Sequence, residues 1–475
     1  MNFNKKLAAA VSGALLLMAG QVALADSSTD IVDALVSKGV LTEEEGKLIN
    51  KGHTSKTNVT PVLKEKDNNF IIESPNGNNS LSLTGRIHLD YRGYNHDDSD
   101  AAALQTNGAD TFEIRRARLG VKYKFAKNYS GEIVFNTVGA INVLDVGYMD
   151  ISWFEKAKFR LGQFKMPFSL EQLTSSNNID FIERSIMDNY IPAKETGAQV
   201  FGEPTKGMTY ALAISNGLPS ANATGIEADS RQDGKDVIGR LTYNFSEAMG
   251  DKENVTHLGA AMSQGESPLG TGLGGNRSTE SRGYGFYTAP TVLDALNMSK
   301  TILRSRYGLE GAFATGPFKV QAQYTVLTNE FEGAANTRFD KETKAGYVEA
   351  LWTLTGEKWA DRYKAGAFGA MKPKNEFNSD TFTGGAWEIG VRYSILDNKD
   401  YLDLAAGTQV SAVATGFALA KTTTVGVKFI ANPNFRVMAD YVYSDFNNPV
   451  GAPTLVNARG VTEEQAVLMR TQIMF

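Results

Sequence analysis

The chain of 475 residues carries 48 Lys and Arg against 53 Asp and Glu, a formal net charge of -5. This acidic balance argues against a nucleic-acid partner, because nucleic-acid-binding proteins are usually basic. The absence of Cys excludes a disulfide framework and a thiolate metal site. With 46 Gly, 25 Phe and 18 Tyr beside 13 Pro, the composition suits many strands joined by turns.

Residues 1–25 have the pattern of a secretory signal peptide. Lys5 and Lys6 give a basic start, an apolar run follows over Leu7–Leu17, and small residues flank the position before Ala25. We expect export and cleavage after Ala25. No later stretch has the roughly 18 uninterrupted apolar residues that a transmembrane helix requires.

Residues 26–79 differ in kind from the rest of the chain. Apolar residues at helical spacing begin at Ile31, and Thr42 with Glu45 has the form of a capping box. These signals predict two short helices, followed by a polar linker over 51–69. We interpret 26–79 as a periplasmic helical segment and linker, acting either as a simple appendage or as an oligomerisation or cell-wall contact.

From residue 80 onward, strand patterns dominate, and the clearest lies at 110–125. Successive side chains of a strand point to opposite faces. One face of this segment is apolar and the other is cationic. The two faces are Leu119, Val121, Tyr123 and Phe125, and Arg116, Arg118, Lys122 and Lys124.

Similar alternation recurs in about 16 segments, which end at the aromatic Phe475. The segments are 81–94, 110–125, 129–137, 143–154, 157–164, 197–201, 208–215, 236–245, 255–263, 303–314, 318–328, 346–355, 385–395, 422–430, 435–443 and 466–475. Short turns alternate with long loops, including an expected external loop over 264–300 and a loop over 401–416. Together with an export signal, this pattern predicts an all-β fold, an antiparallel transmembrane β-barrel over residues 80–475.

The connection over residues 166–195 is too long for a hairpin turn and too polar for a strand. Connections of this length are usually functional or disordered. Its apolar residues, such as Phe168 and Phe181, need a surface to pack on. We expect a loop folded into the barrel that narrows the lumen. The alternative is a surface loop packed on its neighbours.

In a membrane barrel the apolar strand faces must point to lipid, because an Arg or Lys facing the bilayer midplane costs roughly 2–4 kcal/mol. The polar faces therefore line the lumen, and arginine is frequent among them. The expected lumen arginines are Arg86, Arg92, Arg116, Arg118, Arg160, Arg392, Arg436 and Arg470. Such residues favour anions, unless they are neutralised by acidic residues such as Asp90, Glu349, Glu388 and Asp440. Arg115 has the wrong parity for the lumen unless the strand bulges there.

No constellation of catalytic residues is evident. The four His residues, His53, His88, His96 and His257, show no metal-ligand spacing on a shared face. No nucleophile motif or phosphate-binding loop appears in a strand-to-helix context. The sequence therefore predicts neither an enzyme nor a resident metal or cofactor. A lipid hydrolase in a barrel would need a Ser–His pair on the outer face, and none is visible.

Several stretches resemble the phosphate-selective porin O and P family of bacterial outer membranes. They are LTGRIHLDY (83–91), FEIRRARL (112–119), RLGQFKMPFSLEQLTSSN (160–177), ERS (183–185), YGLEGAF (307–313), LTGE (354–357), KP (372–373), GAWEIGVRYS (385–394) and the terminal strand. The resemblance covers roughly residues 80 to 475. It implies a 16-stranded barrel in outer-membrane lipid, a homotrimer, and passive diffusion of small anions.

The resemblance also assigns roles to individual residues. Ladder arginines of the family correspond to Arg86, Arg115, Arg116 and Arg184. An acidic residue near the narrow zone corresponds to Asp145, and two constriction lysines correspond to Lys364 and Lys372. Two further lysine positions are occupied by Ser130 and Gln172, which would lower the local positive charge.

We therefore expect an outer-membrane porin for small anions, with phosphate or polyphosphate as candidate substrates, conducted through an Arg- and Lys-lined lumen. The alternative is a general-diffusion barrel, or a structural or adhesive barrel, without phosphate preference. Ion conductance separates a channel from a plugged barrel.

Overall fold

The computed structural model describes residues 32, 35–49, 60–66, 69–96, 109–138, 144–217, 235–268, 276–292, 301–332, 338–403, 410–412, 414–450 and 462–475. The expected signal peptide and its cleavage site lie outside these ranges. None of the described helices combines the length and apolar character needed to cross a bilayer.

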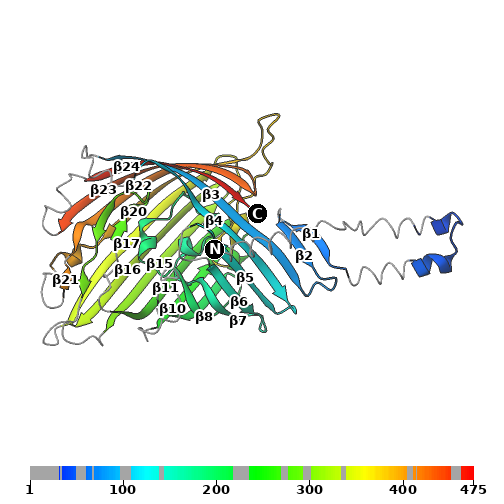
Figure 1. The fold of residues 1–475 in the computed structure, drawn as a ribbon, viewed down its shortest axis with the longest axis horizontal. Coiled ribbons are helices and arrows are strands. Elements are labelled where there is room, and N and C mark those ends of the chain that lie inside the picture. The colour runs from blue at the N-terminus through cyan, green and yellow to red at the C-terminus, as the bar shows by residue number, and fades with distance from the viewer. Residues whose placement is uncertain are drawn as a thin grey trace, which may run out of the picture. The chain divides into compact units, whose positions relative to one another are not determined.

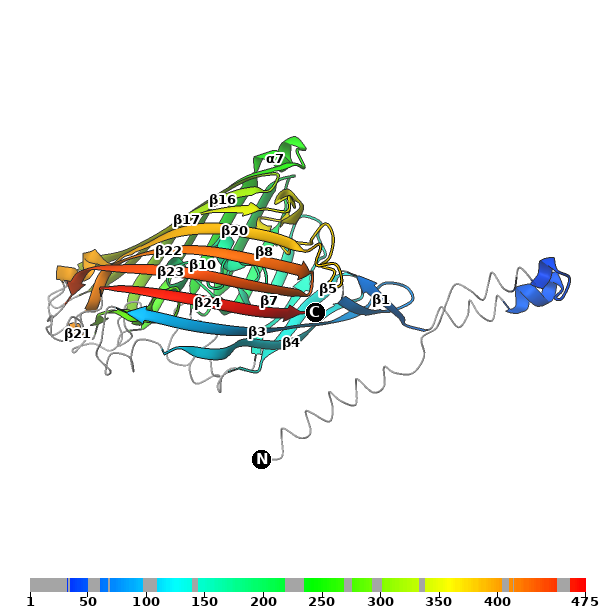
Figure 2. The same cartoon turned by 90° about the horizontal axis from the view of Figure 1, so that it is seen from above.

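Within the described residues, sixteen antiparallel strands close into a barrel (Figures 1 and 2). The strands are β3 (Ser80–His96), β4 (Thr111–Phe125), β5 (Tyr129–Asn136), β6 (Leu144–Ile151), β7 (Lys158–Lys165), β8 (Lys194–Gly202), β9 (Met208–Ser215), β10 (Asp236–Asn244), β11 (Asn254–Pro268), β15 (Thr301–Thr315), β16 (Phe318–Glu332), β17 (Arg338–Thr353), β20 (Ala386–Asp397), β22 (Thr415–Asn432), β23 (Phe435–Val450) and β24 (Glu463–Met474). The last strand pairs with the first, with Met469 opposite Tyr91. This closure confirms the predicted barrel.

The N-terminal part has its own elements. Residues 43–49 are helical, and Thr42 and Glu45 make the reciprocal bonds of a capping box: the Glu45 N–H donates to Thr42 Oγ1 at 3.2 Å, and the Thr42 N–H donates to Glu45 Oε2 at 2.9 Å. Strand β1 (Val62–Lys66) lies within the range 51–69 that was expected to be a linker, and β2 (Asn69–Glu73) begins at its last residue. Part of that range is therefore strand.

Side-chain burial alternates along the barrel strands as the pattern predicts. On β20, Trp387 is 44% exposed and Val391 is 45% exposed, whereas Glu388 and Arg392 are each 2% exposed. The apolar side chains therefore form the outer surface, and the charged ones point inward. This arrangement avoids the free-energy penalty of charge against lipid.

The range 401–416, expected as a loop, is partly structured. It contains the end of the 3₁₀ helix η5 (Lys399–Asp403), the short strand β21 (Val410–Ala412) and the start of β22. Residues 417–420 of β22 are all buried, so both faces are covered and the apolar run does not alternate. A continuous apolar run of this kind gives no period-two signal.

Several connecting segments in the described part of the chain carry buried residues inside the barrel, and three of them bear on the site. The first is 166–193, with α5 (Leu170–Leu173) and the 3₁₀ helix η1 (Ile186–Asn189). The second is 279–290, with β13 (Gly285–Thr288). The third is 354–385, with η4 (Ala360–Arg362), β18 (Tyr363–Lys364) and β19 (Ala367–Phe368).

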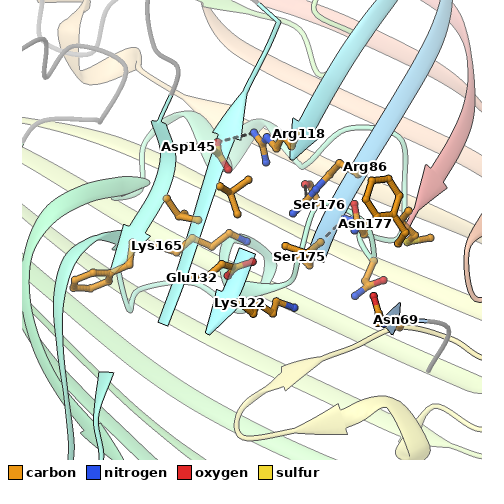
Figure 3. Close-up of a pocket in the computed structure, with 18 of the residues that line it drawn as sticks. Asn69, Arg86, Arg118, Lys122, Glu132, Asp145, Lys165, Ser175, Ser176 and Asn177 are labelled. Carbon is orange, nitrogen blue, oxygen red and sulfur yellow. Dashed lines mark hydrogen bonds and ion pairs between the residues drawn. The ribbon is translucent and has the colours of Figure 1, made fainter. Parts of the chain in front are cut away.

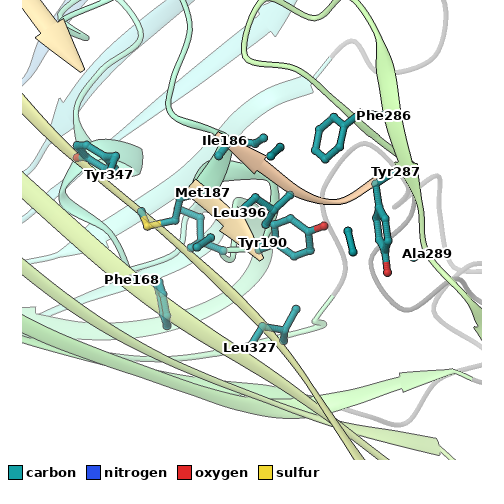
Figure 4. Close-up of a cluster of buried hydrophobic side chains, with 14 of the residues drawn as sticks. Phe168, Ile186, Met187, Tyr190, Phe286, Tyr287, Ala289, Leu327, Tyr347 and Leu396 are labelled. Carbon is teal, nitrogen blue, oxygen red and sulfur yellow. The ribbon is translucent and has the colours of Figure 1, made fainter. Parts of the chain in front are cut away.

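The second segment corrects the expectation of an external loop over 264–300. Phe286 is 0% exposed and stacks on Phe446 with ring centroids 5.4 Å apart. It belongs to the same buried cluster as Ile186, Met187 and Tyr190 of the first segment (Figure 4). The aromatic residues of this Gly- and Ser-rich stretch thus pack inside the barrel, which composition alone does not reveal.

Candidate functional site

The polar residues of one barrel wall hold the segment 166–193 through its backbone. The N–H groups of Leu170 and Glu171 donate to Glu310 Oε2 at 2.8 Å and to Gln323 Oε1 at 3.0 Å. The N–H of Ile182 donates to an Asp440 oxygen at 2.6 Å. Because buried backbone groups need hydrogen-bond partners, these lumen side chains make an ordered inner segment possible.

Three expected lumen arginines bind the carbonyl groups of the same segment. Arg436 donates to the Asn177 carbonyl at 2.6 Å, and Arg392 donates to the Glu183 carbonyl at 3.0 Å. Arg470 donates to the Ile182 carbonyl at 2.5 Å and also pairs with Asp90 at 2.7 Å. These arginines point inward as predicted, but they fasten the inner segment.

Glu183 of this segment lies among four arginines. Its carboxylate oxygens are 2.7 Å from Arg92 Nη2, 2.7 Å from Arg115 Nε, 3.8 Å from Arg116 Nη2 and 3.4 Å from Arg470 Nη2. Burial alone would raise the pKa of Glu183, but the charges of Arg115, Arg116 and Arg470 outweigh it and hold that pKa well below its usual range. Glu183 is therefore ionised at neutral pH.

The alternation of β4 changes face between Arg115 and Arg116. Phe112 and Ile114 are exposed on the outside, yet both arginines reach the carboxylate of Glu183 inside the barrel. Two consecutive residues on one face are what a β-bulge produces. Arg115 is thus a lumen residue despite its parity.

Two cations hold the last turn of α5. Lys165 Nζ donates to the carbonyls of Gln172 at 2.6 Å and Thr174 at 2.8 Å. Arg184 donates to the carbonyls of Glu171 at 3.1 Å and Thr174 at 3.0 Å. These groups satisfy carbonyls that a helix end leaves unpaired. Arg184, expected as a ladder residue, therefore positions α5.

An open cavity of about 550 Å³ lies between the inner segment and the wall formed by β3 to β8 (Figure 3). Seven cationic side chains and two carboxylates line it. They are Arg86, Arg118, Lys122, Arg160, Lys165, Lys194 and Lys372, with Glu132 and Asp145. Basic side chains therefore outnumber carboxylates in the lining of this cavity.

Two of the arginines and one lysine of this cavity have side-chain partners within its lining. Arg86 Nη1 donates to Ser176 Oγ at 2.8 Å, and Arg118 Nη2 lies 2.9 Å from an Asp145 oxygen (Figure 3). Asp145 also accepts from Lys194. The acidic residue expected near the narrow zone thus organises two cations that line the cavity.

A second cavity of about 610 Å³ continues the positive path. Its charged lining consists of Lys156, Lys158, Arg160, Lys165, Arg240 and Lys364, with Glu155 and Glu203. Both cavities share Arg160, Lys165 and Leu173, so they adjoin at these residues. Arg160 makes a bidentate pair with Asp150 at 2.7 and 2.8 Å and lies 3.9 Å from the ring centre of Tyr148.

The expected site residues therefore fall into two groups. Those that line the cavities are Arg86, Arg118, Asp145, Arg160, Lys364 and Lys372. Those that contact Glu183 or α5 instead are Arg92, Arg115, Arg116 and Arg184. Ser130 and Gln172, which stand at two further lysine positions of the family, line neither cavity.

Lys165 and Lys194 line the first cavity but are not among the site residues predicted from the sequence. They are the last residue of β7 and the first residue of β8, directly flanking the inner segment. Their sequence positions could have identified them. The two residues that flank an inward-folded loop lie where the loop leaves the barrel wall, and therefore close to the lumen. The described residues contain no cluster of side chains suited to hold a metal ion.

A sequence model of the family described as "Phosphate-selective porin O and P" matches residues 81–475 of the chain. The chain belongs to this family. Porin O of Pseudomonas aeruginosa is 26% identical over 424 residues, which are 83% of this chain and 88% of that protein. The protein is accordingly an outer-membrane channel and not an enzyme.

The outer membrane channel DcaP of Acinetobacter baumannii has a similar fold, with a TM-score of 0.51. It is 10% identical in sequence, and the match covers 84% of this chain and 97% of that chain. At this identity the likeness concerns the barrel fold alone. It agrees with the strand order and closure of the porin described above.

Proposed function

We propose that this porin passes small anions by passive diffusion, that inorganic phosphate is among them, and that it works as a homotrimer. The single observation that carries the proposal is the charge of the two adjoining cavities. Seven basic side chains and two carboxylates line the first cavity, and six and two line the second, with Arg160 and Lys165 belonging to both. Anions entering this path meet a positive potential, and cations are repelled.

Passage needs binding that is favourable enough to admit an anion and weak enough to release it. Arg86 and Arg118 present planar donors, and guanidinium groups match the oxygens of phosphate. Lys122 and Lys372 add compact charges along the same cavity. Such groups replace part of the hydration shell that an anion loses, without any covalent chemistry.

Phosphate is the anion favoured by the family to which the chain belongs. In this porin, Arg86 and the hydroxyl of Ser176 lie side by side at 2.8 Å on the cavity wall. Charged and hydroxyl donors together suit an oxyanion better than chloride. The two cavities adjoin at Arg160 and Lys165, which also permits a longer polyphosphate to contact both.

A homotrimer is supported by the uneven height of the barrel. Strands β5, β6 and β7 have 8 residues each, whereas β22 has 18. Eight residues tilted by about 40° rise roughly 20 Å, less than the roughly 25 Å apolar band of membrane barrels. Covering this short wall with neighbouring copies keeps its polar rims away from lipid. Light scattering of the purified protein would distinguish three copies from one.

The test is the chloride current of the purified porin in a planar bilayer, measured while phosphate is added. Phosphate should reduce the current by occupying the cavities. Lys364→Glu should weaken this block, because Lys364 lines the second cavity and is exposed there. The matched control is Lys127→Glu, an exposed residue in a turn that lines neither cavity.

Three results contradict parts of the proposal. A current that phosphate does not affect would leave a general anion porin without phosphate preference. Equal block in Lys364→Glu and the wild-type porin would remove the second cavity from the binding path. The absence of any current would indicate a plugged barrel.

A further inference from the structure

We infer that the hairpin 375–385 is a membrane anchor that inserts Phe382 into the periplasmic leaflet of the outer membrane. The hairpin belongs to the long turn between β17 and β20. The same end of the barrel carries the short turns 126–128, 316–317 and 433–434, which marks it as the periplasmic end. The inference concerns contact with lipid and does not depend on which anion the porin passes.

Phe382 has an unusual exposure and backbone. It is 83% exposed, more than any other large apolar side chain among the described residues. Its φ is +53°, in the left-handed region that residues other than Gly, Asn and Asp seldom adopt. A strained residue is retained where the surrounding structure fixes it. The strain and the exposure coincide on one aromatic side chain at the tip of a turn.

The hairpin is held firmly against the end of β22. The Phe377 N–H donates to the Ala431 carbonyl at 2.8 Å, and the Asn378 N–H donates to the Thr383 carbonyl at 2.8 Å. At the base, the Gly385 N–H donates to the Asn375 carbonyl at 2.9 Å. The position of Phe382 is therefore set by a hydrogen-bonded frame.

A row of aromatic rings connects Phe382 with the lipid-facing surface. Trp387 and Phe429 lie on the outside of β20 and β22 with ring centroids 4.7 Å apart. Phe377 packs on Phe429 at 5.3 Å, and Phe382 packs on Phe377 at 6.1 Å. Gly385 makes this packing possible, because a Cβ there would lie 2.5 Å from the Phe429 ring.

The row continues a ring of exposed aromatic residues at the periplasmic ends of the other strands. These residues are Phe125, Trp153, Phe154, Phe159, Phe318 and Trp352. Aromatic girdles mark both interfaces of membrane barrels. Because the row of rings begins on the lipid-facing surface and runs without a gap to Phe382, we assign lipid as its occupant rather than a protein partner.

The anchor would also steady the cationic path. The same turn carries Lys364 and Lys372, which line the two cavities. Its other half is packed inside the barrel, where Trp359 is 1% exposed and Phe368 is 5% exposed. One turn is thus fixed at both ends, by the barrel interior and by the membrane.

The absence of Cys from the chain makes a site-specific test direct. Phe382→Cys and the control Asp380→Cys, an exposed residue of the same hairpin, are labelled with a nitroxide and reconstituted in vesicles of phosphatidylethanolamine and phosphatidylglycerol. Power saturation then compares collisions with oxygen, which concentrates in lipid, and with a water-soluble nickel chelate. Heat-modifiable gel mobility verifies that both variants form closed barrels.

We expect oxygen collisions to exceed nickel collisions severalfold at position 382 and the reverse at position 380. Equal nickel access at both positions would place Phe382 in water and overturn the inference. Protection of position 382 from both reagents would show a protein contact, which also overturns it. Anion conductance enters neither outcome, so failure here leaves the proposed function to be judged separately.

Discussion

Replacing Glu183 by Gln should loosen the inner segment 166–193 from the barrel wall. The change removes the carboxylate shared by Arg92, Arg115, Arg116 and Arg470. Arg116 has no other ion pair in the described part of the chain, and it is 6% exposed. Breaking a buried pair by removing one partner costs about 3–5 kcal/mol.

The assay is native-state hydrogen exchange of the amides of Ile182 and Ser185, whose N–H groups donate to Asp440 and Glu171. A loss of about 3–5 kcal/mol in opening free energy speeds exchange roughly 10²- to 10⁴-fold. The matched control is Glu342→Gln, which breaks an exposed pair with Lys344 at 3.0 Å and should cost at most about 1 kcal/mol. Exchange in Glu183→Gln no faster than in this control would show that the Glu183 carboxylate does not hold the segment to the wall.

The pH dependence of the same amide exchange is a second, independent test of the role of Glu183. The pKa of Glu183 is held below its ordinary value in the folded protein. Its contribution is therefore fully present above the ordinary pKa of 4.5 and is lost as pH falls through the depressed value. Glu183→Gln should lack this acid-dependent loss of protection.

Three further outcomes follow from individual contacts. Asp145→Asn removes one negative charge from the first cavity, so the anion-to-cation permeability ratio from reversal potentials should rise, and a fall would contradict the assigned lining. Burial raises the pKa of Glu171 to about 7, so the contribution of this group to the free energy of unfolding should decline as pH rises from 4.5 to about 7. Glu171→Gln should remove that pH dependence from the melting temperature, and an unchanged dependence would exclude Glu171 as its source. Gly385→Ala should lower the melting temperature, because the added Cβ would lie 2.5 Å from the Phe429 ring. Gly316→Ala, also at positive φ but with no atom within 4 Å of the added Cβ, should lower it less. Equal losses would show that backbone strain alone determines the effect at Gly385.

The barrel could be predicted because each membrane strand carries its own evidence. On β20 the alternation of Trp387, Ile389 and Val391 with Glu388 and Arg392 places every side chain on the correct face. Lipid outside and water inside impose this period-two pattern locally. The extracellular half of β22 lost the signal because residues 417–420 are covered on both faces.

The inner segments could be predicted only in part. Apolar residues in 166–195 indicated a loop that needs a packing surface. The segments 279–290 and 354–385 gave no such indication, because their burial depends on distant partners. Glu280, for example, pairs with Arg392 at 2.7 Å across 112 positions of sequence.

Long sequence separation also explains why the face of a strand residue could be predicted but its role could not. Parity placed Arg392, Arg436 and Arg470 inside the barrel, but their role depends on carbonyls of the segment 166–193. Strand periodicity carries no information on such long-range partners. Lys165 and Lys194 became cavity residues for the same reason, through the position of the segment that they flank.

The reversal potential of a single wild-type channel shows whether the two adjoining cavities form an anion-selective path. Under a potassium chloride gradient, we expect a reversal potential close to the equilibrium potential of chloride. A value near zero, or one close to the equilibrium potential of potassium, would show that the cavities do not select anions.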